Sequence, residues 1–434
     1  MSAVKVKLRQ LNERYQLVVN GQPFYIKGAG LEWGNIKSLA DFGGNAFRTW
    51  RVDNGKQSAL EILDCAQEHG LMVCMGLDVA RERHGFDYDD AQMVAQQKAL
   101  IEEDVRNLKD HPALLMWGIG NELNLRHRNP KVWDAVEEIA QMIHRLDPNH
   151  PVTTMLAGAE PAVIETVVAR CPSLDLLSFQ LYGEIDQLPR FLSDSGYAGA
   201  YTVSEWGATG HWEVERTDWN RPIEPNSSEK ARDYSQRYRD YIQADSHQCL
   251  GAFVFLWGQK QERTPTWYGV FLESGEVSES AQMMQALWTG IPPAHPVPQV
   301  GQLTINGLTA YDHVRLSQGD VAHAVIEVSH QDESTLRYHW EIMHEVDRAL
   351  ESDGGDFEPT PDVVWHASGQ RDGHRIEFTA PTAGEYRLFV YVVDFHGGAA
   401  TANLPILVKP ISLVGRLIKI KQAIMKKWPR KKSS

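Results

Sequence analysis

The sequence predicts an α/β protein in which a (β/α)8 TIM barrel, residues 1–290, precedes an immunoglobulin-like β-sandwich, residues 300–410. Short β-rich runs alternate with longer helical patterns up to a Pro-rich linker at 291–299, and eight such units in about 270 residues are typical of a (β/α)8 barrel. Beyond the linker, strand patterns separated by Gly, Asp and Pro turns indicate a sandwich. A basic amphipathic tail, 411–434, ends the chain.

The barrel is expected to begin with a β-hairpin and to continue with eight parallel strands. Asn20-Gly21 stands between two alternating apolar runs, and this pattern favours a type I′ turn. The eight barrel strands are expected at Tyr25–Ala29, Ala46–Arg51, Met72–Leu77, Leu114–Ile119, Val152–Leu156, Leu176–Leu181, Ala200–Ser204 and Ala252–Trp257.

The sandwich strands are expected to bury alternate residues. The residues expected to point inward are Trp340, Tyr386, Leu388, Val390 and Val392. The acidic stretch 351–358 is expected to be a long solvated loop of this domain, with a position at the mouth of the barrel as the alternative.

Composition and charge narrow the class of protein. Hydrophobic residues make up 42% and charged residues 23%, as in ordinary globular proteins, which excludes a disordered chain or a coiled coil. The net charge of −14 argues against a nucleic-acid partner. Four cysteines without paired spacing, and a start without the apolar core of a signal peptide, predict a cytoplasmic location.

The candidate catalytic residues stand where barrel strands end. The fourth strand runs into WGIGNE, which places Asn121 and Glu122 at the rim, and the seventh runs into SEWG, which places Glu205 there. Because barrel active sites form at the carboxyl ends of the strands, these two carboxylates are expected to face each other. A pair separated by about 5–5.5 Å is the geometry of retaining glycoside hydrolysis.

These motifs resemble the retaining glycoside hydrolases of clan A. HPALLMWGIGNE is similar to the family 2 catalytic barrel, and GGNAFRTWRVDN to families 5 and 72. In family 2 the sandwich domains precede the barrel, whereas here the strand-rich region follows it. The roles that the resemblance implies are acid/base for Glu122, nucleophile for Glu205, donor to the sugar 2-hydroxyl for Asn121, hydrogen bonds to the nucleophile for Arg48 and Tyr182, and floor of the sugar subsite for Trp257.

Further residues are candidates for sugar contacts. Indole rings at or after strand ends, and a polar loop after the eighth strand, supply stacking surfaces and hydroxyl partners, although core packing is the alternative for each indole. These candidates are Trp33, Trp206, Lys260, Glu262 and Trp267. The sequence contains no HExxH, paired Cys/His, GxGxxG or GxxxxGK[ST] pattern, so neither a metal nor an organic cofactor is expected.

The sequence therefore predicts a retaining β-glycosidase that acts on a glucan-like polysaccharide or oligosaccharide and transfers glycosyl groups to water or to sugars. The alternative is a catalytically silent carbohydrate-binding scaffold of a membrane polysaccharide synthase. Residues 411–434 carry eight Lys or Arg and no acid, so residues 1–410 carry −14 − 8 = −22. As a helix this tail is suited to an anionic membrane surface, which predicts peripheral attachment at the inner face, with packing on the sandwich as the alternative.

Overall fold

The computed structural model describes residues 4–32, 34–352, 355–369 and 373–411. Trp33 and nearly all of the basic tail lie outside the described residues. The chain divides into two compact units, neither of which is continuous in sequence. The first comprises Met1–Glu213, Ser228–Val297 and Ser352–Glu358, and the second comprises Val214–Ser227, Pro298–Glu351 and Pro359–Ser434.

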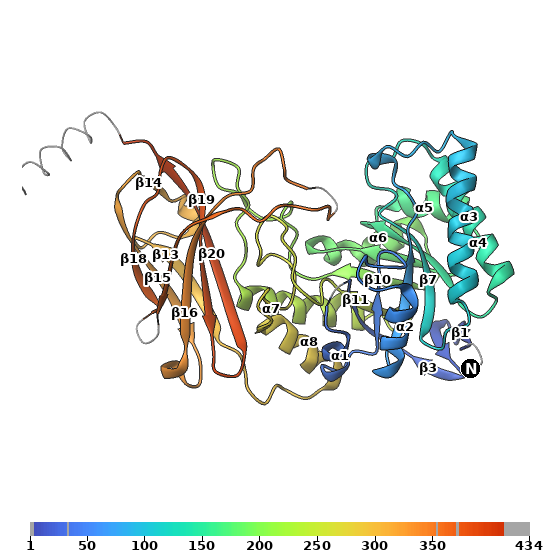
Figure 1. The fold of residues 1–434 in the computed structure, drawn as a ribbon. Helices are drawn as coiled ribbons and strands as arrows, with labels where there is room; N and C mark the ends of the chain where they lie inside the picture. The colour runs from blue at the N-terminus through green and yellow to red at the C-terminus, as the bar shows by residue number, and fades with distance from the viewer. Residues whose placement is uncertain (1–3, 33, 353–354, 370–372, 412–434) are drawn as a thin grey trace, which may run out of the picture. The chain divides into compact units, whose positions relative to one another are not determined.

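In the described part of the first unit, eight parallel strands close a barrel (Figure 1). Neighbours around the barrel follow chain order, and the last strand pairs with the first. The strands are β4 (Ile26–Gly30), β5 (Ala46–Arg48), β6 (Met72–Leu77), β7 (Leu114–Asn121), β8 (Val152–Ala157), β9 (Leu177–Gln180), β10 (Tyr201–Trp206) and β11 (Cys249–Val254). Each overlaps a run expected from the sequence, so the predicted (β/α)8 barrel is confirmed.

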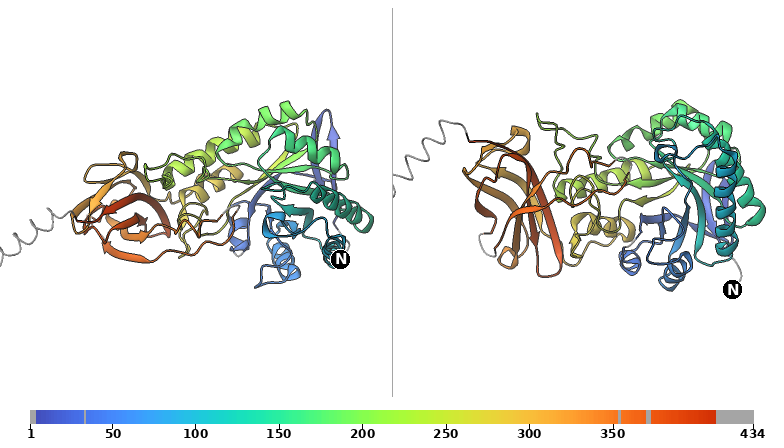
Figure 2. Two further views of the ribbon diagram at one scale, coloured as in Figure 1. Left: turned by 90° about the horizontal axis from the view of Figure 1, so that it is seen from above. Right: turned by 45° about the horizontal axis from the view of Figure 1, so that its top comes forward.

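Helices surround the barrel, and local sequence explains where they begin. The helices are α1 (Ile36–Asp41), α2 (Ala59–Glu68), α3 (Ala91–Leu108), α4 (Lys131–Leu146), α5 (Pro161–Arg170), α6 (Leu188–Ser195), α7 (Ser227–Arg237) and α8 (Glu279–Thr289). Ser58 and Glu61 form a reciprocal capping box at α2, and the Asp90 side chain accepts hydrogen bonds from two backbone N–H groups at the start of α3. Helices α3 and α4 lie side by side on the outside of the barrel (Figure 2).

A small antiparallel sheet covers the amino-terminal end of the barrel. It consists of β1 (Val6–Leu11), β2 (Arg14–Val19) and β3 (Gln22–Phe24). Asn20 and Gly21 have φ values of 48° and 87°, as the expected type I′ turn requires. Val6 and Leu17 are buried with Leu115 from β7 in one apolar cluster. This cluster seals the amino ends of the strands, so the candidate site lies at their carboxyl ends.

The described part of the second unit contains the sheets of a β-sandwich. One sheet has the order β20 (Gly398–Lys409), β19 (Gly384–Val393), β16 (Arg337–His344), β17 (Val363–Gly369), and the other has β13 (Gln299–Ile305), β15 (Val321–Ser329), β18 (Arg375–Thr379). A short strand, β14 (Arg315–Ser317), pairs in parallel with β20. All five residues expected to point inward are buried in one cluster, as predicted.

Residues 214–227, which follow β10 in the chain, belong to this second unit. The guanidinium of Arg221 contacts Glu351 at 2.8 Å and Glu385 at 2.5 Å, and Asn403 donates to Glu224 at 2.6 Å. These buried charge-assisted contacts fix the segment on the sandwich.

The four cysteines are free thiols, as expected from their spacing. Within the described ranges, no helix is long and apolar enough to cross a membrane.

Candidate active site

Two glutamates stand at the carboxyl ends of barrel strands. Glu205 is the last residue but one of β10, and Glu122 directly follows Asn121, the last residue of β7. Glu122 adopts φ of 52°, its N–H donates to the Met155 carbonyl at 2.9 Å, and its own carbonyl accepts from Arg83 at 2.8 Å. The backbone of this residue is therefore fixed on both sides.

Among the described residues, four side chains donate hydrogen bonds to the Glu205 carboxylate. Oε1 accepts from Arg48 at 3.1 Å, from Trp50 at 2.8 Å and from Gln180 at 3.0 Å. Oε2 accepts from the Tyr182 hydroxyl at 2.8 Å. Donors of this kind stabilise a carboxylate in its charged form. Glu205 is consequently held in one orientation in a site where its own exposure is only 5%.

The Asn121 amide is oriented by the same donors. Its Oδ1 accepts from Arg48 at 2.6 Å and from Gln180 at 2.7 Å. Since the oxygen is occupied, the Nδ2 group is the end that can donate to a ligand hydroxyl. Arg48 thereby fixes both Glu205 and Asn121 from β5.

Glu122 has different surroundings. Burial, reinforced by the nearby negative charge of Glu205, raises the pKa of Glu122 to about 7, against the opposing effect of Arg83. The Arg83 guanidinium lies 3.5 Å from Oε2, and that oxygen has no hydrogen-bond partner among the described residues. The structure thus pairs a carboxyl group whose pKa is raised to about 7 with one whose oxygens accept four hydrogen bonds.

Aromatic rings line the region around Glu205. Trp50 and Phe255 meet edge to face with ring centroids 5.8 Å apart, and Phe255 also lies 6.0 Å from the ring of Tyr182. Trp212 lies 5.5 Å from Tyr182, with 53% of its surface exposed. Gly30, the last residue of β4, leaves room for the Trp50 ring, since a Cβ at this position would lie 2.7 Å from it. These rings provide apolar faces beside the carboxylates.

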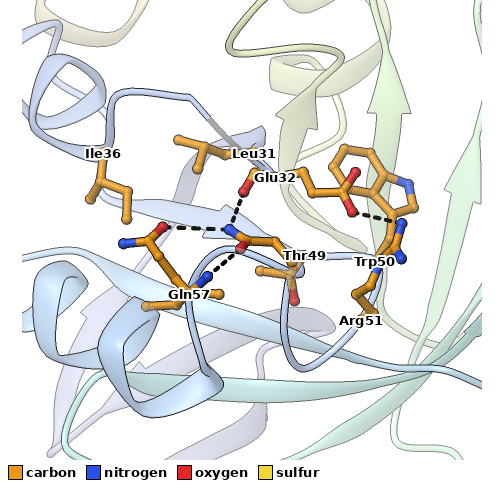
Figure 3. A pocket seen from close by; sticks show the side chains of 9 residues that line it. Leu31, Glu32, Ile36, Thr49, Trp50, Arg51 and Gln57 are labelled. Atoms are coloured by element: carbon orange, nitrogen blue, oxygen red, sulfur yellow. Dashed lines mark hydrogen bonds and ion pairs between the residues drawn. The ribbon is translucent and has the colours of Figure 1, made fainter.

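A small pocket adjoins Trp50 on the side of β4 and β5 (Figure 3). Arg51 and Glu32 form an ion pair there at 2.8 Å, and Asn54 donates to the Glu32 carbonyl at 2.6 Å. Burial raises the pKa of Glu32, although Arg51 acts in the opposite direction. The residues that line the pocket are Leu31, Glu32, Ile36, Thr49, Trp50, Arg51, Asn54, Gln57 and Ile62.

Three of the expected tryptophans lie in packed positions away from the carboxylates. Trp257 is 1% exposed, donates to Ser38 Oγ at 2.8 Å and packs on Phe42 and Phe271. Trp206 stacks on Tyr238 in the core, and Trp267 donates to the Thr209 carbonyl. Because β11 ends at Val254, three residues earlier than expected, it is Phe255 whose ring packs against Trp50 and Tyr182, both of which donate to Glu205.

Lys260 and Glu262 form a charged cluster in the loop after β11. Their side chains contact at 2.9 Å, and His211 lies 3.6 Å from the same carboxylate. Burial opposes ionisation of Glu262, but hydrogen bonds from His211 and Lys260 leave its pKa lowered. The Lys260 ammonium lies 5.8 Å from the centre of the Phe255 ring, so this cluster borders the aromatic lining. Trp33, the remaining candidate, lies outside the described residues.

Gln180, Phe255 and Arg83 were not among the residues expected in the site from the sequence. Gln180 is the last residue of β9, so the position of polar residues at strand ends could have indicated it. Arg83 lies in a single 3-10 turn, Glu82–His84, and no local pattern marks it. Within the described residues, no group of three or more His, Cys, Asp or Glu is placed to hold a metal ion.

Comparisons with known proteins show what the barrel region is similar to. Residues 31–195 match the family model described as "Glycosyl hydrolases family 2, TIM barrel domain". A β-glucuronidase of Pongo abelii is 28% identical over 156 residues, and that of Homo sapiens 27% over 156 residues. Each alignment covers 32% of this chain but only 22% of the relative. A β-D-glucuronidase structure from Dictyoglomus thermophilum has a TM-score of 0.51 at 19% identity, over 66% of this chain and 54% of that one.

Proposed function

We propose that the protein is a retaining β-glycosidase, on the premise that residues 31–195 match the TIM barrel domain of glycoside hydrolase family 2, a family of clan A. The observation that carries the proposal is the contrast between the two carboxyl groups. Glu205 accepts hydrogen bonds that favour its charged form, and the pKa of Glu122 is raised to about 7. A nucleophile and an acid need these opposite charge states at the start of a double displacement.

In the first step, Glu205 attacks the anomeric carbon while Glu122 gives its proton to the glycosidic oxygen, which leaves as an alcohol. In the second step, Glu122, now a carboxylate, removes a proton from water or from a sugar hydroxyl. That oxygen attacks the anomeric carbon and releases Glu205 as a carboxylate. The configuration at the anomeric carbon is inverted twice and therefore retained.

The neighbouring residues have positioning and binding roles in this proposal. Asn121 donates to the 2-hydroxyl of the attacked sugar, and Arg48 and Tyr182 hold the nucleophile. Phe255, with Trp50 beside it, takes the role of sugar floor that the sequence had assigned to Trp257. The Lys260 and Glu262 pair lies beside this floor and offers charged partners for hydroxyl groups.

The substrate is proposed to be a glucan-like polysaccharide or oligosaccharide, with transfer to sugar acceptors as well as to water. The curated relatives are named β-glucuronidases, so a β-glucuronide is the competing substrate. A panel of 4-nitrophenyl β-glucoside, β-glucuronide, β-galactoside and β-mannoside, followed by β-glucans with analysis of product lengths, decides the sugar, the linkage and the extent of transfer.

Covalent labelling tests the proposed function directly. A 2-deoxy-2-fluoro glycosyl fluoride of the preferred sugar should form a stable ester on Glu205, detected as a mass increase of the peptide that contains it. Glu205→Gln should not be labelled, and Glu273→Gln, an exposed glutamate, should be labelled like the wild type. A protein that binds β-glucans but is never labelled and never turns over substrate is the carbohydrate-binding scaffold instead.

We also propose that residues 411–434 attach the protein to an anionic membrane surface, the inner face if the chain is cytoplasmic. Eight basic residues support this, since each contributes about 1 kcal/mol near such a surface. The remaining charge of −22 would oppose binding, so attachment should require the tail and weaken with salt. Co-sedimentation with phosphatidylserine vesicles, comparing the full chain with one truncated after Pro410, tests this. Equal binding by both proteins contradicts it.

A further inference from the structure

A segment that follows β16 in the chain belongs to the barrel unit. Residues 355–358 come from the acidic stretch between β16 and β17, more than ninety positions after the last barrel strand. They are grouped with the barrel and not with the sandwich strands on either side. The alternative considered from the sequence, a position at the mouth of the barrel, is the one that the structure supports.

The loop after β11 holds one end of this segment. The Glu358 carboxylate, 2% exposed, accepts from the backbone N–H of Arg263 at 2.6 Å and also contacts the Arg263 guanidinium. Lys260 donates to the Gly355 carbonyl at 2.6 Å. Charge-assisted hydrogen bonds to a buried carboxylate are strong, so this end is firmly fixed. Lys260 is also the residue beside Phe255, at the border of the aromatic lining.

The loop after β6 holds the middle of the segment. Asp356 Oδ2 lies 3.1 Å from His84 Nε2. His84 directly follows Arg83, whose guanidinium contacts both the carbonyl and the carboxyl group of Glu122. The segment is therefore tied to the loop that carries the partner of Glu122 as well as to the loop that borders Phe255.

Phe357 lies between these two acidic residues, and 87% of its surface is exposed. Its ring is therefore not used for packing in the folded chain, although Glu358 beside it is buried and held by Arg263, and Asp356 on the other side contacts His84. A planar apolar face on a segment that contacts the loop of Arg83, the partner of Glu122, is suited to stack against a pyranose ring. The acid protonates the leaving oxygen, so a ring bound on its side belongs to the leaving group.

We propose that Phe357 forms a binding subsite for a sugar in the leaving-group position, so that the enzyme prefers substrates whose leaving group is itself a saccharide. The proposal rests on the proposed glycosidase function. In the transfer reaction the same ring would bind the acceptor sugar, because donor cleavage and acceptor attack take place on the same face. Asp356 acts as a positioning residue, since it holds the segment next to His84.

The test compares Phe357→Ala with the wild type on two substrates of the same sugar. One is a β-linked oligosaccharide, and the other is the glycosyl fluoride, whose leaving group has no ring. We expect roughly tenfold lower kcat/KM on the oligosaccharide, mainly through KM, and less than twofold change on the fluoride. Phe357→Trp should restore oligosaccharide cleavage. Phe395→Ala is the matched control, because Phe395 is 78% exposed but belongs to the sandwich, and it should change neither rate.

Asp356→Ala should reproduce part of the loss on the oligosaccharide and leave the fluoride rate unchanged. Equal losses on both substrates, or no loss on either, would overturn the proposed subsite while leaving the glycosidase intact. So would a wild type that hydrolyses the fluoride but no oligosaccharide. If the wild type hydrolyses neither substrate and Glu205 is not labelled by the fluoro sugar, the proposed function itself has failed and the subsite with it.

Discussion

Glu205 near the end of β10 and Glu122 after β7 have the same carboxyl group, but the two carboxyl groups have different hydrogen-bonding surroundings. Four described side chains direct N–H or O–H groups at Glu205, whereas Glu122 has one guanidinium at 3.5 Å and an oxygen without a hydrogen-bond partner among the described residues. The Glu205 side chain is 7% exposed and that of Glu122 is 12% exposed. At similar exposure, the two carboxyl groups therefore differ mainly in the number of hydrogen-bond donors directed at them.

The largest effect is expected at the end of β10. Glu205→Gln keeps the size of the side chain and removes the nucleophile, so turnover should fall by about 10⁴-fold or more on every substrate, including glycosyl fluorides. Initial rates with a 4-nitrophenyl glycoside and with the fluoride measure this. If the variant retains more than a small fraction of activity on either, Glu205 is not the nucleophile.

A smaller effect, limited to substrates with poor leaving groups, is expected when Glu122 after β7 is replaced. Glu122→Ala removes the acid, so substrates with poor leaving groups should lose about 10²- to 10⁴-fold, while the first step with a glycosyl fluoride should be nearly unchanged. Azide should then rescue the second step and give a β-azide product, identified by NMR. An α-azide from this variant would mean that the two roles are exchanged.

Removal of a single donor from Glu205 should have an intermediate effect. Tyr182→Phe deletes the hydroxyl that donates to Oε2, and kcat should fall roughly ten- to a hundredfold because a charged carboxylate loses a buried hydrogen bond. Tyr201→Phe is the matched control in β10, the strand that carries Glu205, because the Tyr201 hydroxyl donates to Asp245 and not to Glu205. Equal rates for the two variants would show that the Tyr182 contact does not contribute to catalysis.

The smallest effect concerns the pH profile. Glu122 acts as an acid, so kcat/KM should decline as the pH rises through its pKa of about 7. The cationic Arg83 lowers that pKa, so Arg83→Met should move the alkaline limb upward, by about one pH unit or less. Profiles of both proteins from pH 5 to 9 measure the shift. A limb that moves downward would contradict the assignment of Arg83.

The barrel, and the positions of Glu122 and Glu205 at the ends of two of its strands, could be predicted because they depend on short-range pattern and chain order. Short β-rich runs between helical segments identified the strands, and Glu122 and Glu205 stand in motifs at the ends of two of these strands. The packing of side chains could not be predicted in this way. Whether Trp257 or Phe255 lies beside the carboxylates depends on where β11 ends, and sequence periodicity locates strand ends only within a few residues.

Contacts between residues far apart in the chain could not be predicted from the sequence either. Arg83 contacts Glu122 from a short turn after β6, and Phe357 belongs to a segment that follows the Pro-rich linker in the chain but is part of the barrel unit. Neither has a local signature, because each depends on a pairing across many residues. The raised pKa of Glu122 likewise results from burial and from Glu205, which only the folded barrel brings together.

The exchange of segments between the two units has a consequence for the order in which the protein matures on the ribosome. Synthesis proceeds from the amino terminus, and domains generally fold as units while the chain emerges. The barrel strands are complete by Val254, but Glu358 and its neighbours join the barrel unit only after β13 to β16 have been made. The rim beside Arg83 and Lys260 is therefore the last part of the barrel to form. A nascent chain would carry a folded barrel with an unfinished edge until about half of the sandwich, β13 to β16, has been translated.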